Sequence, residues 1–171
     1  VQHAADRVAL VVANDLTEHL QSVLAPYARF SRCELKVNEY HPGLVVKSEP
    51  GFIANLHMDA SIEGEDVSHS VARILIDARF AWLTQATSER FLPQVLDLHN
   101  QGAVDFDKGC YLGQEIVARA QFRGQVKREL TTFTWQGEPP EVGGTNADGH
   151  NVIAVTTDET GSTSGRGLAV S

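Results

Sequence analysis

The chain has 171 residues, of which 42% are hydrophobic and 21% are charged, and its formal net charge is −8. This length can bury a hydrophobic core and form one or two domains, and the composition is that of an ordinary globular protein. An acidic chain does not make a general nucleic-acid-binding surface, because such surfaces are basic. The longest apolar run, Val8 to Ala13, is too short to cross a bilayer, so we expect no membrane partner.

The cysteine content and the start of the chain bear on the cellular compartment and on whether the sequence is a piece of a longer protein. Two cysteines that lie far apart make no disulfide framework, and no secretory signal is visible. Both features favour the cytoplasm. The chain does not begin with Met, and a strand-like segment follows almost at once, so we expect a piece of a longer protein that lacks its N-terminal portion.

The first part of the chain predicts a strand and a helix. The β-branched run at residues 8–12 is typical of a buried strand. Asn14 and Asp15 offer an N-cap, and Glu18 follows Asp15 by three residues, as in a capping box. We expect the helix to end at Pro26. Its apolar face consists of Leu16, Leu20, Val23, Leu24 and Tyr27.

Further strands and a second helix follow in the predicted order β-α-β-β-α. Residues 33–37 alternate as in a half-buried strand, which places Cys33 in the core, and turns lead into strands at 44–46 and 52–54. The second helix is capped by Asp66 or Ser68. Its apolar stripe is Val71, Ile74, Leu75 and Ala78. This order is that of a split β-α-β, ferredoxin-like unit, which needs a partner subdomain on its uncovered face.

The last part of the chain predicts short strands. An irregular connector at 91–102 leads into a glycine-flanked cysteine motif and a helix, for which Gly124 is the C′ residue. Turn residues then separate three strands, at 130–135, 152–157 and 166–170, which is typical of a small antiparallel barrel or sandwich. The predicted fold class is therefore α+β, with one domain at 1–124 and a β-barrel domain at 125–171.

The segment from Asp107 to Glu115 is the most informative of the sequence. It places Cys110 between Gly109 and Gly113 and two residues after Lys108. A thiolate is the reactive form of cysteine, and a nearby cation and a helix N-terminus both stabilise negative charge. The pattern favours a functional thiol at Cys110, whereas a buried small hydrophobe is the ordinary alternative.

Charge in the following segment is uneven. Residues 116–128 hold four cations and no acid, so removing these from the net charge of −8 leaves −12 on the remainder. The cations are Arg119, Arg123, Lys127 and Arg128. This pattern indicates a local anion site or, equally well, a solvated helix face. Glu115 and Arg119 stand four residues apart, the spacing of a helical ion pair.

Other candidate residues carry weaker signals. The seven histidines show no metal-ligand spacing, and two isolated cysteines cannot hold an iron–sulfur cluster, so we expect no bound metal. His99 is a possible base for Cys110, and Cys33 is the only candidate for a resolving thiol. A cysteine-dependent hydrolase or thiol oxidoreductase therefore stays open as a function.

The motif K-G-C-Y-x-G-Q-E-x-x-x-R, from Lys108 to Arg119, resembles the signature of the YgfZ family. These are folate-binding proteins related to the T-protein, the aminomethyltransferase of the glycine cleavage system. The resemblance extends upstream to the Phe-Leu-Pro-Gln run at 91–94 and downstream to the Phe-Arg-Gly run at 122–124 with Lys127 and Arg128. It is specific over about residues 91–128 and architectural elsewhere.

The resemblance implies both a fold and a function. The fold is a folate-binding domain of two ferredoxin-like halves, of which this chain has the second, followed by a small β-barrel. The function is a tetrahydrofolate-dependent role in the assembly or repair of iron–sulfur enzymes, including those that thiomethylate tRNA, with tRNA contacted weakly or indirectly. An aminomethyltransferase of one-carbon metabolism is the alternative.

The same resemblance assigns roles to the motif residues. Cys110 is the functional thiol, with Lys108 and Glu115 beside it in the catalytic set. Folate contacts fall to Tyr111, Gln114, Arg119 and Arg123.

Overall fold

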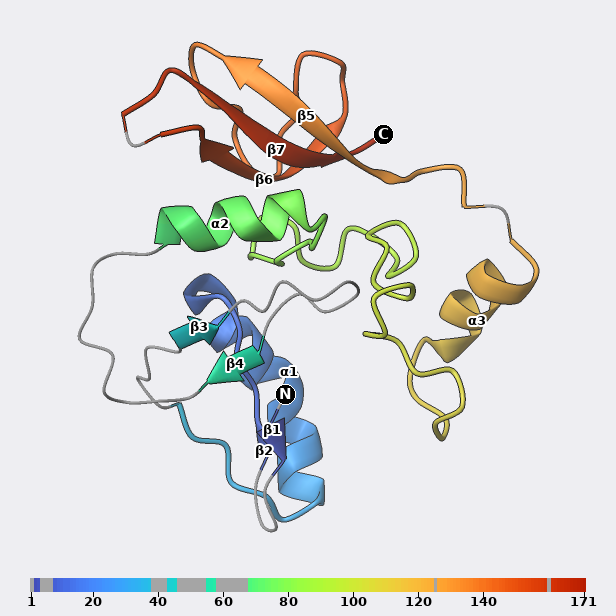
Figure 1. Ribbon diagram of the computed structural model, residues 1–171. Coiled ribbons are helices and arrows are strands. Elements are labelled where there is room, and N and C mark those ends of the chain that lie inside the picture. The colour runs from blue at the N-terminus through green and yellow to red at the C-terminus, as the bar shows by residue number, and fades with distance from the viewer. Residues whose placement is uncertain are drawn as a thin grey trace.

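Figure 1 shows a computed structural model of the chain, which describes residues 2–3, 8–37, 43–45, 55–57, 68–124, 126–159 and 161–171. The helices are η1, a 3-10 turn at Asn14–Leu16, α1 (Thr17–Phe30), α2 (Ser68–Asp77) and α3 (Gln114–Phe122). The strands are β1 (Gln2–His3), β2 (Val8–Ala9), β3 (Gly43–Val45), β4 (Asn55–His57), β5 (Leu130–Gln136), β6 (Asn151–Thr157) and β7 (Ser164–Val170). Helices and strands are mixed, as the α+β class requires.

The C-terminal strands form the largest sheet that the structure describes. β7 lies between β5 and β6 and pairs antiparallel with both, in the order β5-β7-β6. All three predicted strands are confirmed within a few residues, because turn residues at their ends fix where each begins and stops. In the described residues the sheet is open. The earlier strands form two separate two-stranded ribbons, β1-β2 and β3-β4.

The hydrophobic core lies between α2, the connector that follows it, and one face of this sheet (Figure 1). Ile76 of α2 is 1% exposed, and it packs in one cluster with Leu168 of β7 and Ile153 of β6. The segment between α2 and α3 contributes Ala81, Val95 and Leu96, and the remaining members are Leu130 and Val170. The predicted stripe of the second helix is only partly correct, because the buried residue Ile76 is not among its predicted members and Ala78 is exposed beyond the end of α2. The cluster draws residues from both sides of position 124, and the division into two domains there stays a prediction.

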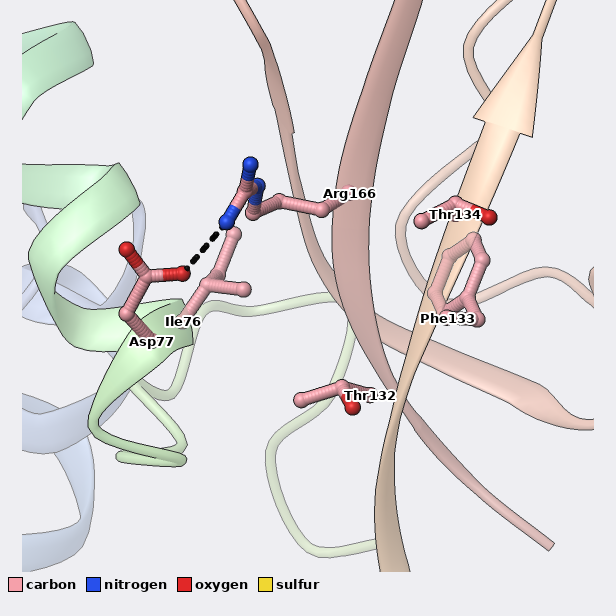
Figure 2. A pocket seen from close by; sticks show the side chains of 6 residues that line it. All are labelled: Ile76, Asp77, Thr132, Phe133, Thr134 and Arg166. Atoms are coloured by element: carbon pink, nitrogen blue, oxygen red, sulfur yellow. Dashed lines mark hydrogen bonds and ion pairs between the residues drawn. The ribbon is translucent and has the colours of Figure 1, made fainter.

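Polar contacts also fix α2 on the sheet. Arg166 of β7 donates from Nη1 to Asp77 at the end of α2 over 2.9 Å, and Figure 2 shows this pair across a hollow between helix and sheet. Near the other end of the helix, His69 Nε2 lies 2.8 Å from Thr157 Oγ1, and Arg73 donates to the carbonyl oxygen of Asp158 over 2.9 Å. Contacts at both ends set the direction in which α2 crosses the sheet.

The N-terminal helix differs from the prediction in both of its ends. Pro26 lies inside α1, which continues to Phe30, so the predicted end is wrong. The last turn is closed by backbone bonds from Ser31 to Tyr27 and from Cys33 to Ala28, and these stabilise the helix beyond the proline. The predicted cap at Asp15 is also not formed. Its carboxylate accepts a hydrogen bond from the backbone N–H of Gln85 instead, over 3.0 Å.

Residues 33–37 do not form the predicted half-buried strand. They are irregular and exposed throughout, and Cys33 is an exposed thiol rather than a core residue. Alternation produces a strand only where a partner strand pairs with it, and the described residues offer none to this segment. The residues 8–37 contain no buried side chain among those described, although α1 is amphipathic.

Several predicted features lie partly outside the described residues. The first strand is shorter than predicted, with only 8–9 paired in the described range. Of the next two, β3 overlaps the predicted segment 44–46, while 52–54 lies outside the description and β4 follows it. Asp66, one of the two predicted caps, is also outside, and Ser68 is the first residue of α2. A ferredoxin-like arrangement is therefore not established.

Candidate functional site

The cysteine motif forms an exposed turn that leads directly into α3. Gly113 is left-handed, with φ of 85°, which favours glycine at this position, and the helix begins at the next residue, where it was predicted. The side chain of Gln114 reaches back and accepts a hydrogen bond from the backbone N–H of Tyr111 over 3.3 Å. The backbone N–H of Gln114 donates to the carbonyl oxygen of Tyr111 over 3.2 Å. These two bonds lock the turn after the cysteine.

Cys110 is exposed, so it is not the buried hydrophobe that is the ordinary alternative. The predicted neighbour, Lys108, places its ammonium 4.7 Å from the centre of the Tyr111 ring. This is a cation–π distance, and it holds the lysine beside the turn. Upstream, Asp105 accepts the backbone N–H of Asp107 over 2.8 Å, so Asp105 acts as the turn residue that its type predicts.

α3 is held to the rest of the protein by few contacts. None of its residues is buried. Gln94 of the connector donates from Nε2 to the carbonyl oxygen of Val117 over 2.8 Å, and the rings of Phe106 and Phe122 meet edge to face with centroids 5.7 Å apart. Ile116 is 61% exposed, whereas Val117 and Ala120 are half-buried, so Ile116 does not hold this helix down.

The cationic stretch divides into two parts. Arg119, Arg123 and Lys127 are exposed. Arg128 instead turns toward the fold: its guanidinium lies 5.3 Å from the ring centre of Phe91, and its Nε donates to the carbonyl oxygen of Ser171 over 3.3 Å. No ion pair links Glu115 to Arg119 in the described part of the chain, so the predicted helical pair is not formed. The exposed cations that could bind an anion are therefore Arg119, Arg123 and Lys127.

Large apolar side chains stand beside these cations. Leu112 is 91% exposed and Phe122 is 71% exposed, and Ile116 lies on the same helix. A surface that combines apolar side chains with arginines is typical of a binding face rather than of solvated surface. The thiol of Cys110 is two residues from Leu112, at the edge of this face.

Sequence reasoning missed the residues that hold α3. Gln94 was recognised only as part of a motif, and Phe106 was not singled out. The available signal for Gln94 was its place in the Phe-Leu-Pro-Gln run. His99, the weak candidate for a base, is half-buried, and its Nδ1 has no hydrogen-bond partner among the described residues. The structure records no contact that would bring it to Cys110.

The four residues predicted to contact folate are better suited to its glutamate tail than to its pterin ring. Arg119 and Arg123 are exposed cations, suited to the glutamate carboxylates of a folate tail. The side chain of Gln114 is engaged with Tyr111, and one face of the Tyr111 ring is taken by Lys108. A pterin ring needs an enclosing pocket. Two hollows in the described residues lie elsewhere, one between α2 and the sheet and one beside the start of α1.

Within the described ranges no cluster of three or more His, Cys, Asp or Glu side chains is arranged to hold a metal ion. No helix in this part of the chain has the length and apolar character needed to span a membrane.

Comparison with known proteins gives partial matches. No family model matches the chain. The tRNA-modifying protein YgfZ of Escherichia coli strain SMS-3-5 is 46% identical over 69 residues, which is 40% of this chain and 21% of that protein. The YgfZ proteins of E. coli K12 and Shigella boydii serotype 18 are 51% identical over 55 residues, 32% of this chain and 17% of each relative. The chain spans about a fifth of the relatives' length, and over that stretch it is similar to the YgfZ proteins.

Proposed function

We propose that this protein is a tetrahydrofolate-binding, YgfZ-like factor that supports iron–sulfur enzymes, including those that thiomethylate tRNA, with Cys110 as its functional thiol. The observation that carries the proposal is the identity of 46–51% to proteins named for tRNA modification. The proposal includes a ferredoxin-like folate half within residues 1–124, a β-barrel at 125–171 and action in the cytoplasm.

The surroundings of Cys110 support a thiol that is presented to a large partner. The turn is exposed, and Leu112 beside it is 91% exposed. An enzyme that uses a thiol on a small molecule encloses it in a pocket, whereas a thiol that serves another macromolecule stands on a surface. We therefore assign the apolar and cationic face of α3 to client iron–sulfur enzymes. The net charge of −8 supports only weak or indirect contact with tRNA.

Folate binding is proposed through its anionic tail. Arg119 and Arg123 would hold the glutamate carboxylates, and Tyr111 and Gln114 would lie toward the ring system. Bound tetrahydrofolate supplies or accepts one-carbon units, and the residues of this chain would orient it near Cys110. Glu115, exposed in the first turn of α3, would contact what binds there rather than pair with Arg119.

A titration tests the folate component. Tetrahydrofolate with one glutamate and with a polyglutamate tail is added to the protein, and binding is followed by calorimetry. We expect the polyglutamate form to bind more tightly, and the advantage to disappear in the double variant Arg119→Gln, Arg123→Gln. Arg29→Gln is the matched control, because Arg29 is an exposed cation on α1. Equal binding of the two forms would contradict the assignment of the arginines, and no binding of either would overturn the folate component.

A second assay separates the proposal from an aminomethyltransferase. Transfer of an aminomethyl group from a lipoyl carrier protein to tetrahydrofolate is measured directly. We expect no turnover in this assay if the protein is the proposed factor, since its thiol motif serves another chemistry. Robust turnover that survives Cys110→Ala would reverse the ranking of the two functions.

A further inference from the structure

A hydrogen bond joins the connector to α3, the helix that follows the cysteine loop. Gln94 is 7% exposed, and its Nε2 donates to the carbonyl oxygen of Val117 over 2.8 Å. The two residues are 23 positions apart in sequence. A buried amide that reaches across this separation to a helix carbonyl fixes the position of the helix, not merely its own conformation.

We propose that Gln94 is a positioning residue that holds α3, and through α3 the Cys110 turn, against the connector. The inference rests on the proposed function in one respect, which is that Cys110 is the functional thiol. The mechanical part, that Gln94 holds α3, stands independently of what the thiol does.

Few contacts hold α3 to the rest of the protein, so the hydrogen bond from Gln94 is a large share of its attachment. No residue of α3 is buried, so little hydrophobic burial holds the helix in place. The edge contact of Phe106 with Phe122 supports the C-terminal end of the helix, where Phe122 is still 71% exposed. Val117 lies nearer the N-terminal end, four residues after Gly113 and seven after Cys110. Of these two contacts on α3, the hydrogen bond from Gln94 therefore lies closer to the turn.

The chemistry of the site requires a donor at position 94. The group that faces Gln94 is a carbonyl oxygen, which only accepts hydrogen bonds, so the amide must present its NH₂ group. The other amide atom, Oε1, is buried with no partner among the described residues. A carboxylate of the same shape would place an acceptor against an acceptor, while a protonated carboxyl could still donate.

Two variants of Gln94 and one control test the proposal. Gln94→Leu removes the donor. Gln94→Glu keeps the shape and donates only when its carboxyl group is protonated. Gln101→Leu is the matched control, because Gln101 donates from the same connector to the carbonyl oxygen of Arg79 over 3.0 Å but makes no recorded contact with α3.

Hydrogen exchange of the α3 amides is the readout of position. In Gln94→Leu we expect exchange about threefold to tenfold faster than in the wild type, the effect of one net hydrogen bond. In Gln94→Glu, after correction for intrinsic rates, exchange matches the wild type at low pH and rises as the carboxyl group ionises. Gln101→Leu leaves α3 unchanged. Unchanged exchange in Gln94→Glu across the pH range would overturn the proposal, even if Gln94→Leu failed to fold.

The link to function is read from cells of the native host. Thiomethylated tRNA should decline in Gln94→Leu and persist in Gln101→Leu. Persistence in Gln94→Leu, despite faster exchange of α3, would overturn the positioning role. Persistence in Cys110→Ala would overturn the proposed function instead, and the exchange measurements would still decide whether Gln94 holds the helix.

Discussion

Trp135 on β5 lies directly opposite Gly165 on β7, and its indole ring covers the space in which a side chain at position 165 would stand. The pair is repeated two residues along, where Phe133 lies opposite Gly167. On this face of the sheet two aromatic rings therefore pack onto bare backbone. The opposite face carries Leu168 and Val170 into the core, so β7 is buried on both sides.

Alanine at either glycine should destabilise the sheet. A Cβ at Gly165 would stand 2.0 Å from the carbonyl oxygen of Thr156 and 2.7 Å from a ring carbon of Trp135. Both are far inside contact distance, and overpacking of this kind costs about 1–3 kcal/mol of unfolding free energy. Denaturant unfolding of Gly165→Ala measures it, with Gly109→Ala as the control because nothing lies within 4 Å of a Cβ there. Equal midpoints for the two variants would contradict the packing.

Truncation of a core side chain should lower the free energy of unfolding more than truncation of a side chain on the exposed face beside Cys110. Leu168 is fully buried, with 0% exposure, in the cluster with α2. Leu168→Ala is expected to lower the free energy of unfolding by about 2–5 kcal/mol through lost burial and an added cavity. Leu112→Ala, at a side chain that is 91% exposed, should change it by less than about 0.5 kcal/mol. A large loss in Leu112→Ala would contradict the exposed position of this side chain.

Acid should weaken the side-chain contacts that join Asp158, after β6, to Ser164 and Arg166 of β7. The hydrogen bond from Ser164, followed by the guanidinium of Arg166, lowers the pKa of Asp158 below its ordinary value of 3.8. The hydrogen bond and charge of Asp77, with a smaller contribution from Asp158, raise the pKa of Arg166. A carboxyl group whose folded pKa is lowered stabilises the fold fully above the unfolded value and loses that contribution as pH falls through the folded value.

Asp158→Asn is the variant that tests this dependence. Thermal unfolding of the wild type should shift to lower temperature as pH falls below about 4, and the shift should be smaller in Asp158→Asn. Asp148→Asn, an exposed loop carboxylate, is the control. Parallel acid curves for Asp158→Asn and the wild type would show that this carboxylate does not couple to folding.

Both cysteines should be accessible in the native protein. Cys33 and Cys110 are exposed, so a thiol reagent should modify both without unfolding the chain. Replacement of either by Ser should leave the free energy of unfolding within about 0.5 kcal/mol of the wild type. Mass spectrometry after brief alkylation under native conditions measures the reaction. Labelling of Cys33 that requires denaturant would restore the core assignment that its sequence pattern suggested.

Local patterns predicted the C-terminal part of the fold well. The three strands of the sheet were visible because glycine, proline and asparagine turns bound them, and α2 was visible from its apolar stripe. The start of α3 followed from Gly113, whose left-handed backbone the sequence could suggest but not prove. In each case the information lies within a few residues of the element.

Long-range partners explain what could not be predicted. The alternation at 33–37 lacked a pairing strand, and no local pattern reveals that. Asp15 looked like a cap but bonds to Gln85, 70 positions away. The role of Gln94 depends on Val117, 23 positions away, whose carbonyl oxygen accepts its hydrogen bond. At the site, the motif identified Cys110 and its neighbours, while the contact of Lys108 with Tyr111 and the turn of Arg128 toward Phe91 are products of tertiary structure.

The central claim is that Cys110 is the functional thiol, and substitution in the native host tests it most directly. Cys110→Ala is compared with Cys33→Ala, which removes the other exposed thiol, and thiomethylated nucleosides of total tRNA are quantified by mass spectrometry. We predict that the modification is lost or strongly reduced in Cys110→Ala at unchanged protein level, and that it is retained in Cys33→Ala. Wild-type modification in Cys110→Ala would contradict the claim.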